Sequence, residues 1–202
     1  VNPNLRIRDQ SRCPASTDVK HVIGEVEQHR GRSWGLKADV SRAHRRYKHR
    51  KEDWGLMACS LDDPLELFLN CVGTFGIGCA SYWWTRLFSI LCRAAGALTL
   101  NQVIFQLLYA DDVHWITSGA EGIEGVVVCI FFMTLMGTPF TWSKTEGGFV
   151  YEWIGYQISL ENHELGISVD RAAWMTSWIE NALDTDHILV RDLVAVVGRL
   201  SF

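Results

Sequence analysis

The sequence lacks closely spaced cysteines, long apolar runs and an overall positive charge. Its six cysteines form no Cys-x-x-Cys pair and do not combine with the seven histidines at zinc-finger intervals. We therefore expect a reduced intracellular protein of the cytoplasm or nucleus. The longest apolar stretch, residues 126–136, is interrupted by Thr134 and is too short to cross a bilayer. We expect no membrane span, and the sequence shows no signal peptide.

The net charge of −4 argues against a nucleic-acid-binding protein if it is taken as an average. The charge is unevenly distributed, however, because residues 1–51 carry +8 and residues 52–202 carry −12. The basic side chains are densest in residues 42–51. Such a run is often only a solvated surface, but its position directly after Asp39 favours phosphate binding.

The length and apolar content set the size of the core. With 202 residues, 48% of them apolar, the chain can bury one substantial core, so we expect one globular unit with subdomains. Most of the nine tryptophans should simply fill that core.

Two adjacent acids stand at a tight turn within residues 107–116, between two apolar, strand-like arms. Asp111 and Asp112 would repel each other, and a divalent cation would remove that conflict. Mg²⁺ is the expected ion because it prefers carboxylate oxygens. The other acidic pair, Asp62 and Asp63, precedes Pro64 and is interpreted as a solvated turn.

A third acid lies upstream, because Asp39 ends a short strand-like run within residues 36–44. Three acids from two segments are what a two-metal phosphoryl-transfer site requires. The alternative is that Asp39 caps a helix and that Asp111 and Asp112 form an ordinary turn.

The order of these motifs resembles that of reverse transcriptases. Asp39, with Ala43 four residues later, resembles their first polymerase motif, and residues 109–112 (Tyr-Ala-Asp-Asp) resemble their Tyr-x-Asp-Asp turn. Residues 75–81 resemble the template-handling motif Phe-Gly-Leu-x-x-Ala-Pro, although Ser81 replaces the proline. An aromatic-rich segment follows this motif.

Two further segments complete the resemblance, which covers about residues 36–160. Lys144 resembles the lysine of the fourth motif, and residues 153–155 resemble the hairpin that grips the primer. The implied function is template-directed DNA synthesis on RNA with two Mg²⁺ ions, Mn²⁺ being a possible substitute. Asp39 and Asp111 would bridge both metals, with Asp112 as an auxiliary ligand. Lys144 would protonate the pyrophosphate, or it is merely a surface lysine.

The resemblance also implies substrate contacts. The incoming nucleotide is assigned to Ala43, His44 and Gly76, and the template and primer to Arg45, Arg46, Trp153 and Gly155. His44 stands where the family has Phe or Tyr, so its imidazole could block a 2′-hydroxyl or hydrogen-bond to it. Gly76 with Gly78 could instead form a ligand-free turn before a helix, and residues 153–155 could be a plain edge strand.

The implied fold class is α+β, a polymerase palm with an antiparallel sheet backed by two helices. We expect partial fingers at residues 1–35, the palm at 36–160 with an inserted fingers hairpin at about 45–75, and the start of a thumb or connection at 161–202. The partners would be an RNA template, a DNA primer and deoxynucleoside triphosphates. The chain would be a weakly active part of a retrotransposon polyprotein with further RNase H, integrase or recombinase domains.

Helical spacing and turn residues predict most of the expected elements. Helices 79–95 and 121–136 are the two palm helices that the resemblance implies, the second despite residues 126–128, whose β-branched side chains prefer a strand. Thr17 or Asp18 would cap the first helix, Gly96 would end the second, and Asp170 would cap the fourth. The expected helices are 17–27, 79–95, 121–136, 170–183 and 188–200; the expected strands are 54–59, 65–71, 102–108, 113–117, 149–160 and 166–169, with a turn at 31–35 before the Asp39 strand.

Three rival functions are weaker. A non-catalytic scaffold derived from a reverse transcriptase, binding RNA or protein, would have no use for three mutually repelling acids. An RNA-dependent RNA polymerase usually has Asp at the position of His44. A palm-fold nucleotide cyclase needs an acidic turn that residues 147–149, Gly-Gly-Phe, do not supply.

Overall fold

The structure is a computed structural model that describes residues 12–61, 65–74, 76–185 and 187–200. The expected turn at Asp62–Pro64 and the first residue of the motif at 75–81 lie outside the described residues. Within the described part, no helix combines the length and apolarity needed to cross a membrane.

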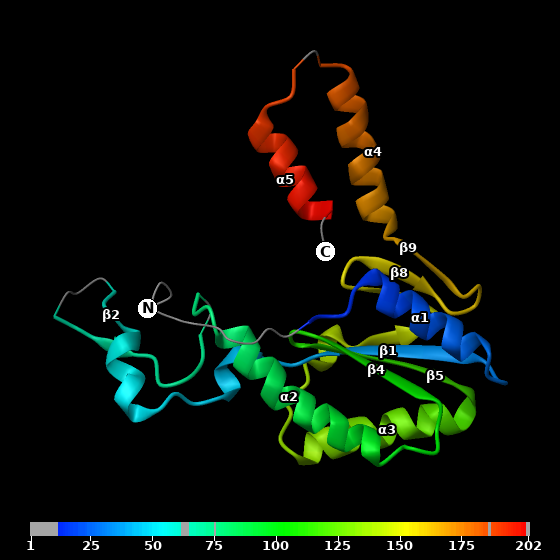
Figure 1. Ribbon diagram of the computed structural model, residues 1–202, viewed down its shortest axis with the longest axis horizontal. Helices are drawn as coiled ribbons and strands as arrows, with labels where there is room; N and C mark the ends of the chain where they lie inside the picture. Colours follow the sequence, from blue (N-terminus) through cyan, green and yellow to red (C-terminus); the bar gives the residue numbers. More distant parts are fainter. Residues whose placement is uncertain (1–11, 62–64, 75, 186, 201–202) are drawn as a thin grey trace.

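A four-stranded antiparallel sheet forms the centre of the molecule (Figure 1). Its strands, in spatial order, are β4 (Ile104–Tyr109), β5 (Asp112–Ser118), β1 (Ser33–Asp39) and β6 (Glu146–Gly148). Helices α2 (Ala80–Ala97) and α3 (Gly119–Leu135) cover one face of this sheet, as Figure 1 shows. This arrangement confirms the expected palm.

Alternate residues of β5 enter two separate cores, as the two-residue period of a strand requires. Val113 and Trp115 pack with side chains of α2 and α3, whereas Ile116 packs on the opposite face. That opposite face is covered by α1 (Ser16–Glu27) and by the antiparallel sheet of β7 (Val150–Trp153), β8 (Tyr156–Ser159) and β9 (Glu164–Ile167).

The segment between β1 and α2 is mostly irregular. It contains the 3-10 helices η2 (Ala43–Arg46) and η3 (Lys51–Met57) and a short ladder of β2 (Ala58–Cys59) with β3 (Phe68–Leu69). The expected hairpin is therefore present, but with two residues in each strand. The strand predicted at 54–59 was largely wrong, because residues 54–57 belong to η3 and only residues 58–59 form a strand.

The last two helices, α4 (Val169–Leu183) and α5 (Val190–Leu200), project away from the body as a hairpin (Figure 1). Both helices were predicted, but Asp170 is not the cap of α4. Ser168 is the N-cap, and its hydroxyl accepts the backbone N–H of Arg171 at 3.4 Å. At α1, the N-cap is Ala15 instead of Thr17 or Asp18, and the Asp18 carboxylate accepts the Ala15 N–H at 2.8 Å.

Other boundaries also differ from the prediction. The turn at 31–35 ends early because β1 begins at Ser33, and α2 continues through Gly96 to Ala97. The predicted strand at 149–160 is interrupted at Ile154 and Gly155, which have φ values of +43° and +84°. These two residues turn the chain from β7 into β8.

Candidate active site

The three motif acids lie at one end of the central sheet. Asp39 ends β1 and is the cross-strand partner of Asp112, the first residue of β5. Ala110 and Asp111 form the two-residue turn between β4 and β5. The Val40 N–H donates to the Asp111 carbonyl at 3.0 Å, so the chain just after Asp39 is tied to the acidic turn.

The conformation of this turn is fixed by helix α2. Ala110 has φ +52°, in the left-handed region that residues with a Cβ rarely adopt. The indole N–H of Trp84 donates to the Ala110 carbonyl at 3.0 Å, and the Trp84 side chain is buried against Phe88. The sequence interpretation missed Trp84, although a buried indole usually needs such an acceptor.

The acids repel each other across the turn. Burial, followed by the negative charges of Asp111 and Asp39, raises the pKa of Asp112 to about 6, while Lys37 and Lys144 act in the opposite direction. The site therefore carries unfavourable negative charge near neutral pH, which a bound cation would reduce.

Two lysines lie beside the acids. Lys144, in the 3-10 helix η4 (Trp142–Lys144), places its Nζ 3.3 Å from Oδ2 of Asp39. Lys37 lies two residues before Asp39 in β1 and contacts Glu146 at 2.6 Å and the Glu152 carbonyl at 2.5 Å. The sequence could have indicated Lys37, because residues two apart share one face of a strand.

A pocket of about 620 Å³ opens at this end of the sheet. It is lined by Lys37, Asp39, Asp112, Ser143, Lys144, Thr145, Glu146, Trp153 and Ile154. Acids from two strands, two lysines and the β7–β8 turn therefore share one concave surface.

The residues fit a divalent cation in their chemistry, since carboxylate oxygens suit Mg²⁺. Among the described residues, no group of three or more His, Cys, Asp or Glu side chains has the arrangement of a formed metal site.

The residues assigned to the nucleotide lie on the segment leaving β1 and on the turn before α2. Ala43 begins η2 and is buried in the core, so it supports its neighbour His44 rather than exposing a contact surface. Gly76 has φ +87°, a conformation that favours glycine.

The residues assigned to template and primer divide into two groups. Arg45 and Arg46 are exposed, and Arg46 lines a groove beside α2 instead of the acidic pocket. Trp153 is buried and lines the acidic pocket, and Gly155 forms the adjoining turn. Its φ of +84° favours glycine, whereas the Arg171 guanidinium near an added Cβ is the end of a flexible side chain and could move aside.

A buried polar pair that the sequence interpretation missed joins the β7–β8 hairpin to β5. His114 and Tyr151 share a hydrogen bond of 2.5 Å between Nε2 and Oη, and the His114 ring lies 4.5 Å from that of Trp153. Burial, with a smaller effect of Lys37, lowers the pKa of His114 to about 3. Gly35 leaves the space that Tyr151 occupies, because a Cβ there would overlap the phenol.

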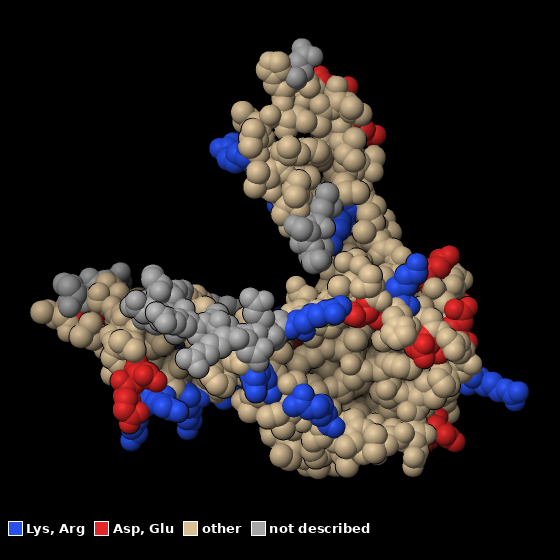
Figure 2. Space-filling model, viewed as in Figure 1, with Lys and Arg blue, Asp and Glu red and all other residues tan. Residues whose placement is uncertain are grey.

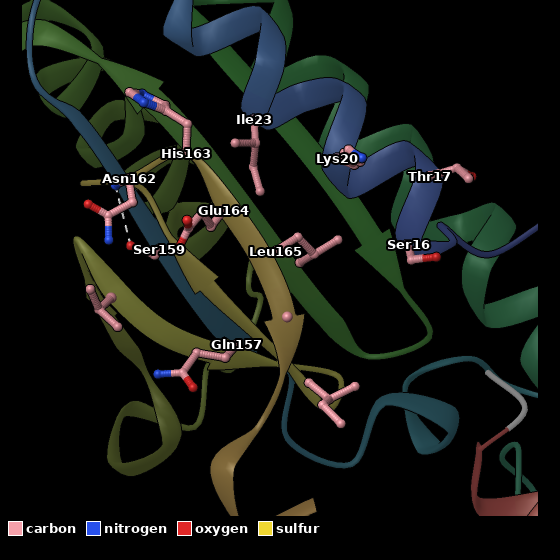
Figure 3. A pocket seen from close by; sticks show the side chains of 13 residues that line it. Ser16, Thr17, Lys20, Ile23, Gln157, Ser159, Asn162, His163, Glu164 and Leu165 are labelled. Carbon is pink, nitrogen blue, oxygen red and sulfur yellow. Dashed lines mark hydrogen bonds between the residues drawn. The ribbon is translucent and has the colours of Figure 1, made fainter. Parts of the chain in front are cut away.

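A larger pocket of about 820 Å³ lies between α1 and the β8–β9 region (Figure 3). Figure 3 shows Lys20 on the helix and Asn162, His163 and Glu164 on the opposite wall. None of the three motif acids lines it. The smaller pocket is therefore the better candidate active site, because it contains the acids.

Comparison with solved structures identifies the fold. No family model and no curated protein matches the sequence. The foamy viral protease-reverse transcriptase dRH in complex with double-stranded DNA matches with a TM-score of 0.69 and 12% identity, over 98% of this chain and 31% of that chain. The fold is that of a reverse-transcriptase polymerase domain.

Two other solved structures share this reverse-transcriptase fold. The foamy viral protease-reverse transcriptase with an RNA/DNA hybrid matches with a TM-score of 0.65 and 12% identity, over 93% of this chain and 23% of that chain. Telomerase from Candida albicans, in complex with a fragment of telomeric RNA, gives 0.61 and 12%, over 78% and 34%. The chain thus spans about a third or less of the matched chains.

Proposed function

We propose that this chain carries out template-directed DNA synthesis on RNA, by transfer of a nucleotide to a primer 3′-hydroxyl. The observation that carries the proposal is the pairing of Asp39 with Asp112 beside the Asp111 turn, in one pocket with Lys144. If Asp39 only capped a helix and Asp111 and Asp112 only formed an ordinary turn, there would be no reason for Asp39 and Asp112 to be partners on adjacent strands. The nucleic-acid complexes of the matched structures support a nucleic-acid partner for this chain.

The residues have separate roles in this proposal. Two Mg²⁺ ions, or Mn²⁺ in their place, would be held by Asp39, Asp111 and Asp112, and would stabilise the attacking and leaving oxygens. Lys144, whose ammonium lies beside Asp39, would donate a proton to the departing pyrophosphate. Trp153 and Gly155 would position the primer end, since their hairpin borders the pocket.

The remaining assignments concern substrate selection. His44 would lie beneath the incoming sugar, with Ala43 and Gly76 shaping the nucleotide site. Arg45 and Arg46 would contact template or primer phosphates. We also propose a retrotransposon polyprotein as the source, with deoxynucleoside triphosphates as substrates and further nuclease, integrase or recombinase domains as neighbours.

The test is primer extension on poly(rA)·oligo(dT) with Mg²⁺ or Mn²⁺. Asp111→Asn should reduce extension at least about a hundredfold, because loss of one metal-binding carboxylate removes charge stabilisation from the transition state. Template binding should persist or tighten slightly, since a negative charge near phosphate is removed. Asp184→Asn, at the exposed C-terminal end of α4, is the matched control and should extend normally.

A non-catalytic scaffold is the second candidate function. It is favoured by the position of exposed Arg46, which lines a groove beside α2 instead of the acidic pocket, so that nucleic acid would be bound away from the acids. The same assay separates the two: a wild-type chain that binds template and primer but extends no primer with either metal would establish the scaffold instead of the polymerase.

A further inference from the structure

Lys37 is a lysine in the interior of the central sheet. Its cross-strand partners are His114 on β5 and Glu146 on β6, so it lies between two neighbouring strands. Several Lys and Arg side chains stand out from the surface in Figure 2, whereas the Lys37 side chain is only 22% exposed. A lysine is seldom so covered unless its ammonium is paired. The contacts of this ammonium therefore indicate what Lys37 does.

The Lys37 side chain lies on the face of β1 that the β7–β8 hairpin covers. Residues two apart in a strand share a face, so Gly35, Lys37 and Asp39 lie on one side of β1. The Tyr151 phenol of β7 occupies the space beside Gly35. One residue later in β7, the Glu152 carbonyl accepts a hydrogen bond from the Lys37 Nζ at 2.5 Å. Lys37 thus joins β1 to the backbone of β7.

The sheet of β7, β8 and β9 is tied to β1 at both of its ends. At the β8–β9 turn, Arg32 contacts Glu161 at 3.0 Å. The β7–β8 turn lies at the opposite end, because β8 runs antiparallel to both of its neighbours. Near this end the bond from Lys37 is made one residue before Trp153. The two ties together fix how the hairpin crosses β1.

The Lys37 tie lies between the acids and the residues assigned to the primer. Lys37 is two residues before Asp39 in β1. Glu152 is followed directly by Trp153, which lines the acidic pocket. A shift of β7 along β1 would therefore move the β7–β8 turn relative to the acids. A misplacement of ~1 Å between reacting groups can cost about a hundredfold in rate.

We propose that Lys37 is a positioning residue, which keeps the β7–β8 turn, and the primer 3′ end that it would hold, at a fixed distance from Asp39 and Asp112. This inference rests on the proposed function. The geometry argues against a direct contact of Lys37 with the triphosphate, because the Glu146 carboxylate at 2.6 Å and the Glu152 carbonyl already take two of the three ammonium donors. The Glu146 carboxylate also offsets the positive charge that would attract a phosphate.

Hydrogen exchange without nucleic acid tests the tie itself. Lys37→Met keeps most of the apolar stem and removes the ammonium. Protection of the amides in residues 149–160 should fall about threefold or more, whereas protection in residues 104–118 should stay unchanged, because only the hairpin loses a tie. Lys37→Arg keeps a charged donor and should restore most of the protection. Lys20→Met, at an exposed lysine of α1, is the matched control and should exchange like the wild type.

Single-nucleotide primer extension at saturating template-primer tests the positioning role. Lys37→Met should lower kcat about ten- to a hundredfold, because the primer end is misplaced. The KM for the deoxynucleoside triphosphate should stay within about twofold of the wild-type value, because no contact with that substrate is lost. Lys37→Arg should recover most of kcat, and Lys20→Met should extend normally.

Three results would overturn the positioning role. Unchanged exchange in residues 149–160 would mean that Lys37 does not hold the hairpin. An equal loss of protection in residues 104–118 would mean that the variant is destabilised generally. A raised KM with an unchanged kcat would mean that Lys37 binds the triphosphate directly. A wild-type chain that extends no primer would refute the proposed function and this role with it, whereas the three results in an active chain refute the role alone.

Discussion

The sheet that carries the acids and the segment that carries the basic run are held in different ways. Strands β1 and β5 pair over seven residues, and Val113–Ser118 of β5 is buried throughout. Strands β2 and β3 pair over two residues, and η3 has no buried residue. The acids are therefore positioned by extensive long-range pairing and packing. The basic segment is held by local turns and by an isolated bridge between Lys48 and Val72, so it should open more easily.

The largest contrast should appear on replacing one tryptophan in each region. Trp84→Ala removes a buried side chain and the hydrogen bond to the acidic turn, so the free energy of unfolding should fall by ~3–5 kcal/mol. Trp54→Ala, in the partly exposed basic segment, should cost about 1 kcal/mol. Urea denaturation measures both, and equal losses would contradict the comparison.

A smaller effect is expected from adding one methyl group at the sheet. Gly35→Ala would press on the Tyr151 ring, so the free energy of unfolding should fall by about 1–3 kcal/mol. Gly166→Ala is the control, because no atom lies near its added Cβ. If the two variants unfold at the same denaturant concentration, the close contact of Tyr151 with β1 is wrong.

The buried histidine predicts a pH dependence of stability. Because the pKa of His114 is lowered to about 3 in the folded protein, the unfolded chain binds more protons between pH ~6.5 and 3. Stability should therefore fall as the pH is lowered through this range, by at most about 1.4 kcal/mol per pH unit.

Asp112 affects the pH dependence of stability in the opposite direction, so it must be replaced before the contribution of His114 can be measured. Its raised pKa means that the folded protein binds more protons between pH ~4 and 6, so its contribution to stability falls as the pH rises. In an Asp112→Asn background, His114→Gln should reduce the remaining dependence of the free energy of unfolding on pH. Denaturation at a series of pH values measures this dependence. An unchanged slope would mean that His114 is protonated in the folded chain.

The smallest expected effect concerns the exposed basic run. Reversing Arg45 and Arg46 to Glu should weaken template-primer binding similarly for all sequences, because phosphate contacts carry no base information. The log–log salt slope should fall by about 0.7–0.9 for each phosphate that the variant no longer neutralises. Fluorescence anisotropy across a salt series measures this, with Arg93→Glu on α2 as the control. Unchanged affinity and slope would identify a solvated surface.

Local sequence signals predicted much of the fold. Helical spacing predicted α1, and the apolar arms around Asp111 and Asp112 predicted the β4–β5 hairpin. The resemblance to reverse transcriptases implied α2 and α3 as the two palm helices, although residues 126–128 of α3 favour a strand. The predicted caps were wrong, because Ser168 and Ala15 take those positions. A side chain that is able to cap a helix does not by itself decide at which residue the helix begins.

The sequence by itself determined the presence of three acids, a basic first quarter and an α+β chain, since composition and short-range periodicity need no tertiary contacts. Only the tertiary structure decided that Asp39 pairs with Asp112, that Trp84 holds the acidic turn, and that His114 meets Tyr151. It also decided that one side of α3 stays exposed. These features depend on strand register and helix packing between residues far apart in the chain, where one-residue shifts would reverse which side chains are buried.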